Sequence, residues 1–160
     1  MRKFEKINFE QFKKDIDDNK ELYDSYKLPK RSTKKSAGYD LCSLVEYNLL
    51  PNESVVIPTG LKVCLPDDEF LMLAIRSSLG FKYNVRLANQ VGIIDADYYN
   101  NDSNEGHIMV KLHNHGDKDL LINIGDRVAQ GIFMKYLTVE DEEEIESERK
   151  GGFGSTGKGE

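Results

Sequence analysis

An aspartate pair follows a short apolar run in the middle of the chain. Asp95 and Asp97 come directly after Gly92–Ile94, and in an extended strand the two side chains would face the same side. A carboxylate beside a dry apolar surface can hold a water molecule and accept a proton from it, as a general base does. Tyr98 could add a ring face for a sugar or a base, although such tyrosines more often pack in a core. Aspartate is also common in turns, so the pair alone fits a catalytic site or a strand end.

Arg76–Gly80 closes another apolar run with the sequence RSSLG. A cation, two hydroxyl groups and a glycine together suit the oxygens of a phosphate group. Ser-Ser-Leu-Gly is also the composition of an ordinary turn, and for these residues alone the turn is the more common outcome.

The sequence GGFGSTGKG, residues 151–159, is close to the phosphate-binding pattern G-x-x-x-x-G-K-[ST]. The match fails at Gly159, which stands where the pattern requires a metal-binding hydroxyl. Glycines still leave backbone N–H groups free to converge on an anion, and Ser155 and Thr156 add hydroxyl donors. The segment is therefore either a tail that folds over a phosphate or a disordered end.

His113 and His115 would project from one face of a strand, and the letters HNH suggest a metal site or a nuclease. Zinc needs three or four protein ligands, and no further ligand stands nearby at a recognisable spacing. A solvated strand end is the expected role.

Charge and composition limit the partners. The chain carries 28 acidic and 22 basic residues, a net charge of -6, which argues against binding a nucleic-acid polymer or a membrane surface but allows a small anion to bind locally. Cys42 and Cys64 form no C-x-x-C pair and fit buried free thiols in a reducing cytoplasm. No apolar run is long enough for a signal peptide or a membrane span, so a soluble cytoplasmic protein is expected.

The elements that must position these residues are mainly strands. One short helix is expected around Phe9, Phe12 and Ile16, with Asn8 as its N-cap and Gln11 completing a capping box. Strands are expected at residues 44–49, 54–57, 61–65, 70–76, 85–87, 92–94, 108–112, 120–124 and 127–136. Many short strands without intervening helical patterns predict an all-β sandwich or barrel.

This pattern of predicted elements divides the chain into three regions. Residues 1–27 form an N-terminal extension with the short helix, residues 28–139 form the β domain, and residues 140–160 form an acidic linker and a glycine-rich tail. Seven of the ten residues from Glu140 to Arg149 are acidic, which is typical of a solvated, flexible connector. A tail on such an arm could reach a neighbouring subunit.

Five segments in order, SAGYDL (36–41), RSSLG (76–80), NQVGIIDADYY (89–99), GDRVAQ (125–130) and GGFGSTG (151–157), resemble the five motifs of the homotrimeric dUTP pyrophosphatases, or dUTPases. The resemblance runs from Leu28 to Gly157. It implies a jelly-roll-like β-barrel or sandwich with a flexible C-terminal lid. It also implies magnesium-dependent hydrolysis of dUTP to dUMP and pyrophosphate, in a homotrimer whose active sites each draw on three chains.

The resemblance also implies roles for individual residues. Asp95 would be the general base that activates water for attack on the α-phosphorus. Uracil would be read in a tight hairpin by Asn89 and the segment containing Gly92, Ile93 and Ile94. Tyr98 would lie under the deoxyribose and exclude a ribose 2′-hydroxyl, while Met109 would contact the substrate.

The remaining roles concern the phosphates, the metal and the lid. Phosphate oxygens would be held by Arg76, Ser77, Ser78 and Gln130, and Asp40 would hold waters of Mg²⁺. In the lid, Phe153 would stack on uracil, and the residues closing over the nucleotide would be Arg149, Gly154, Ser155 and Thr156. Arg149 lies four residues before Phe153 rather than the family's usual five, where Glu148 stands.

Two other functions are considered. A dCTP deaminase shares the fold but uses a glutamate in the third motif, and residues 85–98 contain none. A nucleotide-gated regulatory protein could contact a protein partner through the N-terminal helix and the loop YNNDSNEG (99–106), which lie outside or interrupt the family pattern. These segments fit surface decoration equally well.

Overall fold

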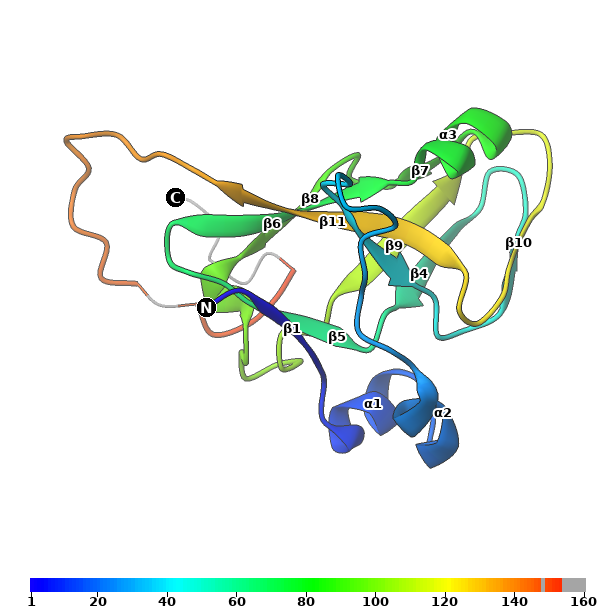
Figure 1. The fold of residues 1–160 in the computed structure, drawn as a ribbon, viewed down its shortest axis with the longest axis horizontal. Coiled ribbons are helices and arrows are strands. Elements are labelled where there is room, and N and C mark those ends of the chain that lie inside the picture. The colour runs from blue at the N-terminus through cyan, green and yellow to red at the C-terminus, as the bar shows by residue number, and fades with distance from the viewer. Residues whose placement is uncertain (148, 154–160) are drawn as a thin grey trace.

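Antiparallel strands form the body of the protein, as a computed structural model shows for the described residues, 1–147 and 149–153 (Figure 1). The largest sheet has the order β2 (Tyr39–Cys42), β11 (Arg127–Lys135), β6 (Glu69–Ile75), β8 (Gly92–Asp95). A second sheet has the order β4 (Ser54–Pro58), β9 (Met109–Asn114), β7 (Val85–Leu87). Two smaller sheets pair β1 (Lys3–Lys6) with β5 (Leu61–Cys64) and β10 (Leu120–Ile122) with β3 (Tyr47–Leu49).

The core lies between the sheets and explains why these segments are strands. In β6 the side chains of Leu71 and Leu73 are buried. Their neighbours Phe70, Met72 and Ala74 are more exposed, as expected for a period of two residues. The largest buried side chains of this core include Leu41, Leu49, Ile57, Leu71, Ile108, Leu112 and Ile122. The all-β prediction is confirmed.

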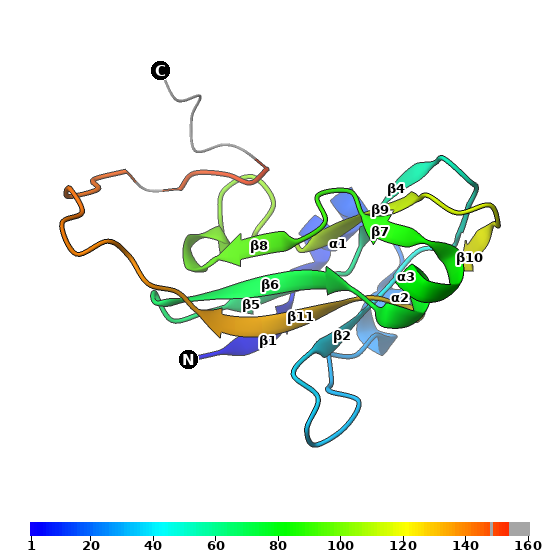
Figure 2. The same ribbon diagram turned by 90° about the horizontal axis from the view of Figure 1, so that it is seen from above.

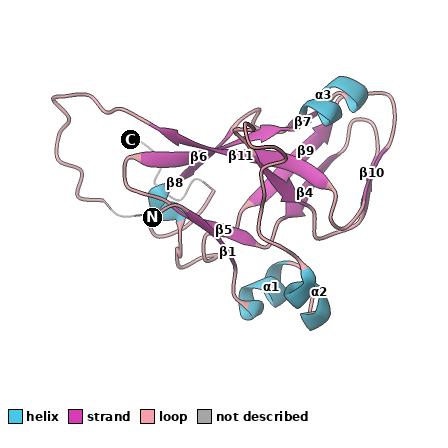
Figure 3. Cartoon of the chain, viewed as in Figure 1, coloured by secondary structure: helices cyan, strands magenta, loops and turns pink. Residues whose placement is uncertain are grey.

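Two short helices, α1 (Phe9–Asp15) and α2 (Lys20–Ser25), stand where the sequence predicted one (Figure 3). They pack through a small aromatic cluster around Phe12 and lie near the β1–β5 pair (Figure 1). Asn8 caps α1 as expected, because its side chain accepts from the N–H of Gln11. The capping box is wrong: the Gln11 side chain donates to Asp15 instead, and the Asn8 N–H donates to Glu105.

Short helical segments follow strands β6 and β8. Ser77–Tyr83 forms α3 directly after Arg76, so RSSLG begins a helix rather than an isolated turn. The strand β8 ends at Asp95, and Ala96–Tyr98 forms a 3₁₀ turn, so Asp97 does not share the strand face of Asp95. The polar side chains and the glycine are compatible with a turn and with a short helix.

The acidic connector leaves the end of β11 and makes a wide excursion before the chain returns above β8 (Figure 2). Residues 140–147 have neither helix nor strand, as their charge density predicted. Among the described residues, no helix is long and apolar enough to cross a lipid bilayer.

Candidate active site

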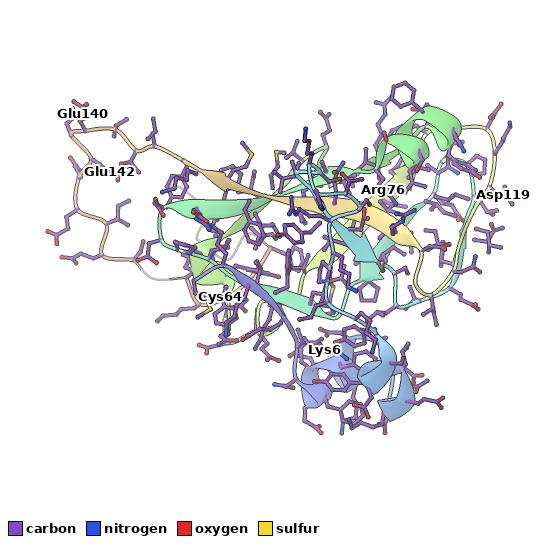
Figure 4. The ribbon with its side chains drawn as sticks, in the orientation of Figure 1. Lys6, Cys64, Arg76, Asp119, Glu140 and Glu142 are labelled. Atoms are coloured by element: carbon purple, nitrogen blue, oxygen red, sulfur yellow. The ribbon has the colours of Figure 1, made fainter. Side chains whose placement is uncertain are left out.

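Strand β6 separates two groups of the residues singled out above. The register pairs Asp95 with Phe70 near the beginning of β6, whereas Arg76 follows its last residue, Ile75. Six residues of extended strand span about 20 Å. The polar residues therefore form one group around Asp95 and another around Arg76. Arg76 lies beside α3 and far from Glu140 and Glu142 of the acidic arm (Figure 4).

The Asp95 group lines one cavity of about 190 Å³. Its lining brings together strand, turn and tail residues that are far apart in the sequence: Leu73, Asn89, Gly92, Ile93, Ile94, Asp95, Tyr98, Met109, Arg149 and Phe153. A neighbouring cavity of about 470 Å³ shares Asn89, Gly92, Met109 and Phe153 with it. All the residues assigned to the base, uracil and sugar thus lie together.

Gly92 allows β8 to pack closely against β6 at the cavity, because a Cβ atom there would lie 2.9 Å from the Cβ of Leu73. The expected hairpin around residues 89–94 is wrong in its pairing. β7 pairs with β9 while β8 pairs with β6, so residues 88–91 turn from one sheet to another. The turn is nevertheless tight, with the Gln90 N–H donating to the Leu87 carbonyl.

Arg149 binds both aspartates of the DAD sequence. Its Nη2 donates to Asp95 Oδ2 and its Nε to Asp97 Oδ1, each at 2.7 Å. The expected dry surroundings of Asp95 are not present in the single chain, where its side chain is 49% exposed. The Arg149 guanidinium thus lies against two carboxylates of its own chain.

Tyr98 forms the floor of the cavity. Its side chain is 6% exposed, and its hydroxyl donates to the His107 carbonyl at 3.0 Å. Burial raises the pKa of this phenol, so it stays protonated at neutral pH. The ring of Phe153 meets the Tyr98 ring edge-on, with centroids 6.4 Å apart.

The second group surrounds Asp40 at the end of β6. Its carboxylate lies 3.3 Å from Arg76 Nε and 3.5 Å from Arg127 Nη1, and it accepts from the Ser32 hydroxyl at 2.7 Å. Gln130 is paired with Asp40 across β2 and β11. Asp40 and Arg127 border a cavity of about 620 Å³ in which Asp40 is the one acidic lining residue.

Ser77 and Ser78 follow Arg76 in the first turn of α3 and are exposed. Gln130 donates from Nε2 to the Ile75 carbonyl at 3.2 Å, which ties it to the end of β6. Every residue assigned to phosphate within residues 1–147 therefore lies in the Asp40 group.

Sequence patterns did not single out Ser32 or Arg127, which complete the surroundings of Asp40. Arg127 lies inside the GDRVAQ segment, so a search for cations within each motif would have found it. Ser32 has no such signal, because its contact depends on the path of residues 27–38. Gly154, Ser155 and Thr156 lie outside the described residues.

The histidine pair behaves as expected of a strand end. His113 is in β9, His115 follows it, and their ring centroids lie 4.2 Å apart. Among the described residues, no three histidine, cysteine or acidic side chains gather as a metal site would require.

Comparison with known proteins identifies the family. The dUTPase family model matches residues 24–157, which include all five motifs. The chain belongs to the dUTPase family.

Individual dUTPases agree in sequence and in fold. The deoxyuridine 5′-triphosphate nucleotidohydrolase of Lactococcus lactis is 47% identical over 131 residues, covering 81% of this chain and 87% of that protein. The dUTPase crystal structure from Streptococcus mutans is 37% identical and has a TM-score of 0.69, covering 86% of this chain and 98% of the other. A mutant dUTPase of phage phi11 of S. aureus, described with a structural Mg(II) ion, shares the fold at 21% identity and a TM-score of 0.67, covering 92% and 97%.

Proposed function

We propose that this protein hydrolyses dUTP to dUMP and pyrophosphate, with Asp95 as the general base. The observation that carries the proposal is the single cavity lined by Asp95, Asn89, Tyr98 and Phe153 in a chain of the dUTPase family. Asp95 has an open carboxylate at the edge of this cavity, where a water molecule can reach it. That water would attack the α-phosphorus.

The cavity suits a deoxyuridine. The backbone of residues 89–94 would supply donors and acceptors for the uracil edge, and this tight segment would leave no room for a methyl group on the base. Tyr98 would support the deoxyribose, Met109 would contact the nucleoside, and Phe153 would cover the base.

The phosphates would be held by Arg76, Ser77, Ser78 and Gln130. The residues present also fit a magnesium ion, because Mg²⁺ keeps several waters and needs only one or two carboxylates besides the phosphate oxygens. Asp40 is the carboxylate that would hold it, through water. When bound, Mg²⁺ would supply positive charge to the triphosphate.

The proposal includes a homotrimer, because the proposed site needs residues from more than one copy of the chain. Asp95 and Arg76 must act on one triphosphate, yet in one chain they stand at opposite ends of β6. A second copy would bring its Arg76 group to the Asp95 cavity of the first. The resemblance to the trimeric dUTPases supports three copies, arranged cyclically.

Arg149 would change partners during the reaction. In this structure it neutralises Asp95 and Asp97, and a bound triphosphate would offer it stronger anionic partners. Its departure would free Asp95 to accept a proton while its charge moves to the phosphates.

The first experiment is pyrophosphate release from dUTP, dTTP, dCTP and UTP in parallel, with magnesium and then with a chelator. Magnesium-dependent turnover of dUTP alone is the expected result. Ammonia release from dCTP would instead indicate the deaminase. No turnover by a folded protein would contradict the proposal and favour the nucleotide-gated regulatory role.

A further inference from the structure

The loop 99–106 contacts Tyr98 through Asn101, Asn104 and Gly106. We propose that Asn104 is a positioning residue: it holds Tyr98 in place as the floor of the sugar subsite and so sets the discrimination between deoxyribose and ribose. The inference rests on the proposed hydrolysis of dUTP. It gives the loop a role within the reaction.

The Tyr98 hydroxyl has two partners. It donates to the His107 carbonyl at 3.0 Å and accepts from Asn104 Nδ2 at 2.8 Å. Asn104 lies within the turn of the loop, and His107 follows it. A phenol with one donor and one acceptor partner has a fixed hydroxyl position.

The amide of Asn104 is itself held in one orientation. Its Oδ1 accepts from Asn101 Nδ2 at 2.9 Å and from the Gly106 N–H at 3.1 Å. Because the oxygen faces these two donors, the Nδ2 group must face Tyr98. Asn101 also donates from Nδ2 to the Tyr98 carbonyl at 2.8 Å, so backbone and side chain of Tyr98 are bound by the same loop.

The loop is anchored at its far end. Glu105 accepts from the Asn8 N–H and from Lys62 Nζ, and Lys62 also donates to Asn100. Gly106 has φ +81°, and a Cβ atom there would lie 2.7 Å from the Tyr98 carbonyl oxygen. Only glycine permits this close approach of the loop to Tyr98.

His107 links the residues that hold Tyr98 to helix α1. Its Nε2 accepts from the Gly60 N–H at 2.9 Å, so the ring proton is on Nδ1, which donates to Asp15 at 2.7 Å. The imidazole is fully buried and cannot move without breaking both bonds. The carbonyl that receives the Tyr98 hydroxyl is therefore attached to a fixed residue.

Tyr98 also contacts the tail. A Cβ atom on Gly152 would lie 2.8 Å from Tyr98 Cε2, and the Gly152 N–H donates to the Ser103 hydroxyl at 3.3 Å. The ring thus contacts both the loop and the tail, and it lines the cavity proposed for the nucleoside. Ribose exceeds deoxyribose by one hydroxyl, so rejection by contact needs a floor held to within about 0.5 Å.

The test compares Asn104→Ala with Asp102→Ala, an exposed residue in the same loop. The measured quantity is kcat/KM for dUTP divided by kcat/KM for UTP. Asn104→Ala should lower this ratio about tenfold, chiefly through a lower KM for UTP, with kcat for dUTP little changed. Asp102→Ala should keep the wild-type ratio. A merely structural loss would lower both activities together.

A double-mutant cycle with Tyr98→Phe tests whether Asn104 acts through its hydrogen bond to the Tyr98 hydroxyl. Phenylalanine lacks the hydroxyl, so adding Asn104→Ala to it should change the ratio by less than about twofold. An independent, additive effect would overturn the proposal, as would an unchanged ratio in Asn104→Ala. Should that variant not fold, Tyr98→Phe alone must lower the ratio, and an unchanged ratio overturns the inference. Wild-type protein without dUTP turnover would instead refute the proposed function.

Discussion

Arg149 donates to Asp95 at 2.7 Å, so the tail's cation occupies an oxygen of the carboxylate that the proposed reaction needs. The same guanidinium donates to Asp97, which places one cation between two carboxylates. Under the proposed function, Arg149 would leave Asp95 before this carboxylate accepts a proton from water. Several expected results depend on this arrangement.

Asp95→Asn should lower kcat at least about 1,000-fold while dUTP binding, measured by calorimetry, stays within a few fold. Asparagine keeps the shape of the side chain but cannot accept the proton. Asp97→Asn is the matched control, because it also loses a contact to Arg149 without losing the base. Equal losses in the two variants would show that the Arg149 contact, rather than proton transfer, accounts for the effect.

Arg149→Gln should lower kcat about 100-fold for dUTP, because one charge-assisted donor to the phosphates is removed. Lys150→Gln tests the neighbouring exposed cation and should leave kcat nearly unchanged. Steady-state kinetics at fixed ionic strength measures both. If the two variants behave alike, the effect of Arg149 comes from general positive charge near the tail.

Chains carrying Asp95→Asn and chains carrying Arg76→Gln should each be inactive alone and should recover activity after mixing and subunit exchange. Because the two residues lie about 20 Å apart in one chain, a site built from two copies can draw an intact residue from each. With random mixing of equal amounts, about a quarter of the sites are intact.

Mass measurement must confirm that mixed oligomers have formed. Mixtures of wild-type chains with either variant give the reference activity with which the recovered activity is compared. Mixed oligomers without any recovered turnover would mean that Asp95 and Arg76 act within the same chain, contrary to the proposal.

Stability should fall as the pH is lowered below about 6.5, the ordinary pKa of histidine. Burial lowers the pKa of His107 in the folded protein, so between that lowered pKa and about 6.5 the unfolded chain binds more protons than the folded one. Protonation therefore favours unfolding in this window, and stability rises again with pH.

The melting temperature at pH 7.5 minus that at pH 5.5 measures this effect. His107→Gln, which does not titrate, should give a smaller difference than the wild type, whereas His113→Gln, at a half-exposed position, should resemble the wild type. An unaltered difference in His107→Gln would assign the pH dependence to other groups.

Sequence alone determined the strands and most of the site's membership. A short apolar run between turn residues predicted strand 70–76, because such runs are typical of buried strands. Asp95, Tyr98 and Phe153 were found from motif order, since local residue types carry the chemistry. The exposed acidic arm was likewise a local property, set by charge density.

Tertiary structure alone decided which of these residues lie together and which lie apart. The separation of Asp95 from Arg76 depends on the register of β8 against β6, in which Asp95 pairs with Phe70, a residue distant in the sequence. The bonds from Asn104 to Tyr98 and from His107 to Asp15 likewise arise from packing. Such contacts have no local periodicity, because the folded chain brings distant segments together only to bury the side chains between them.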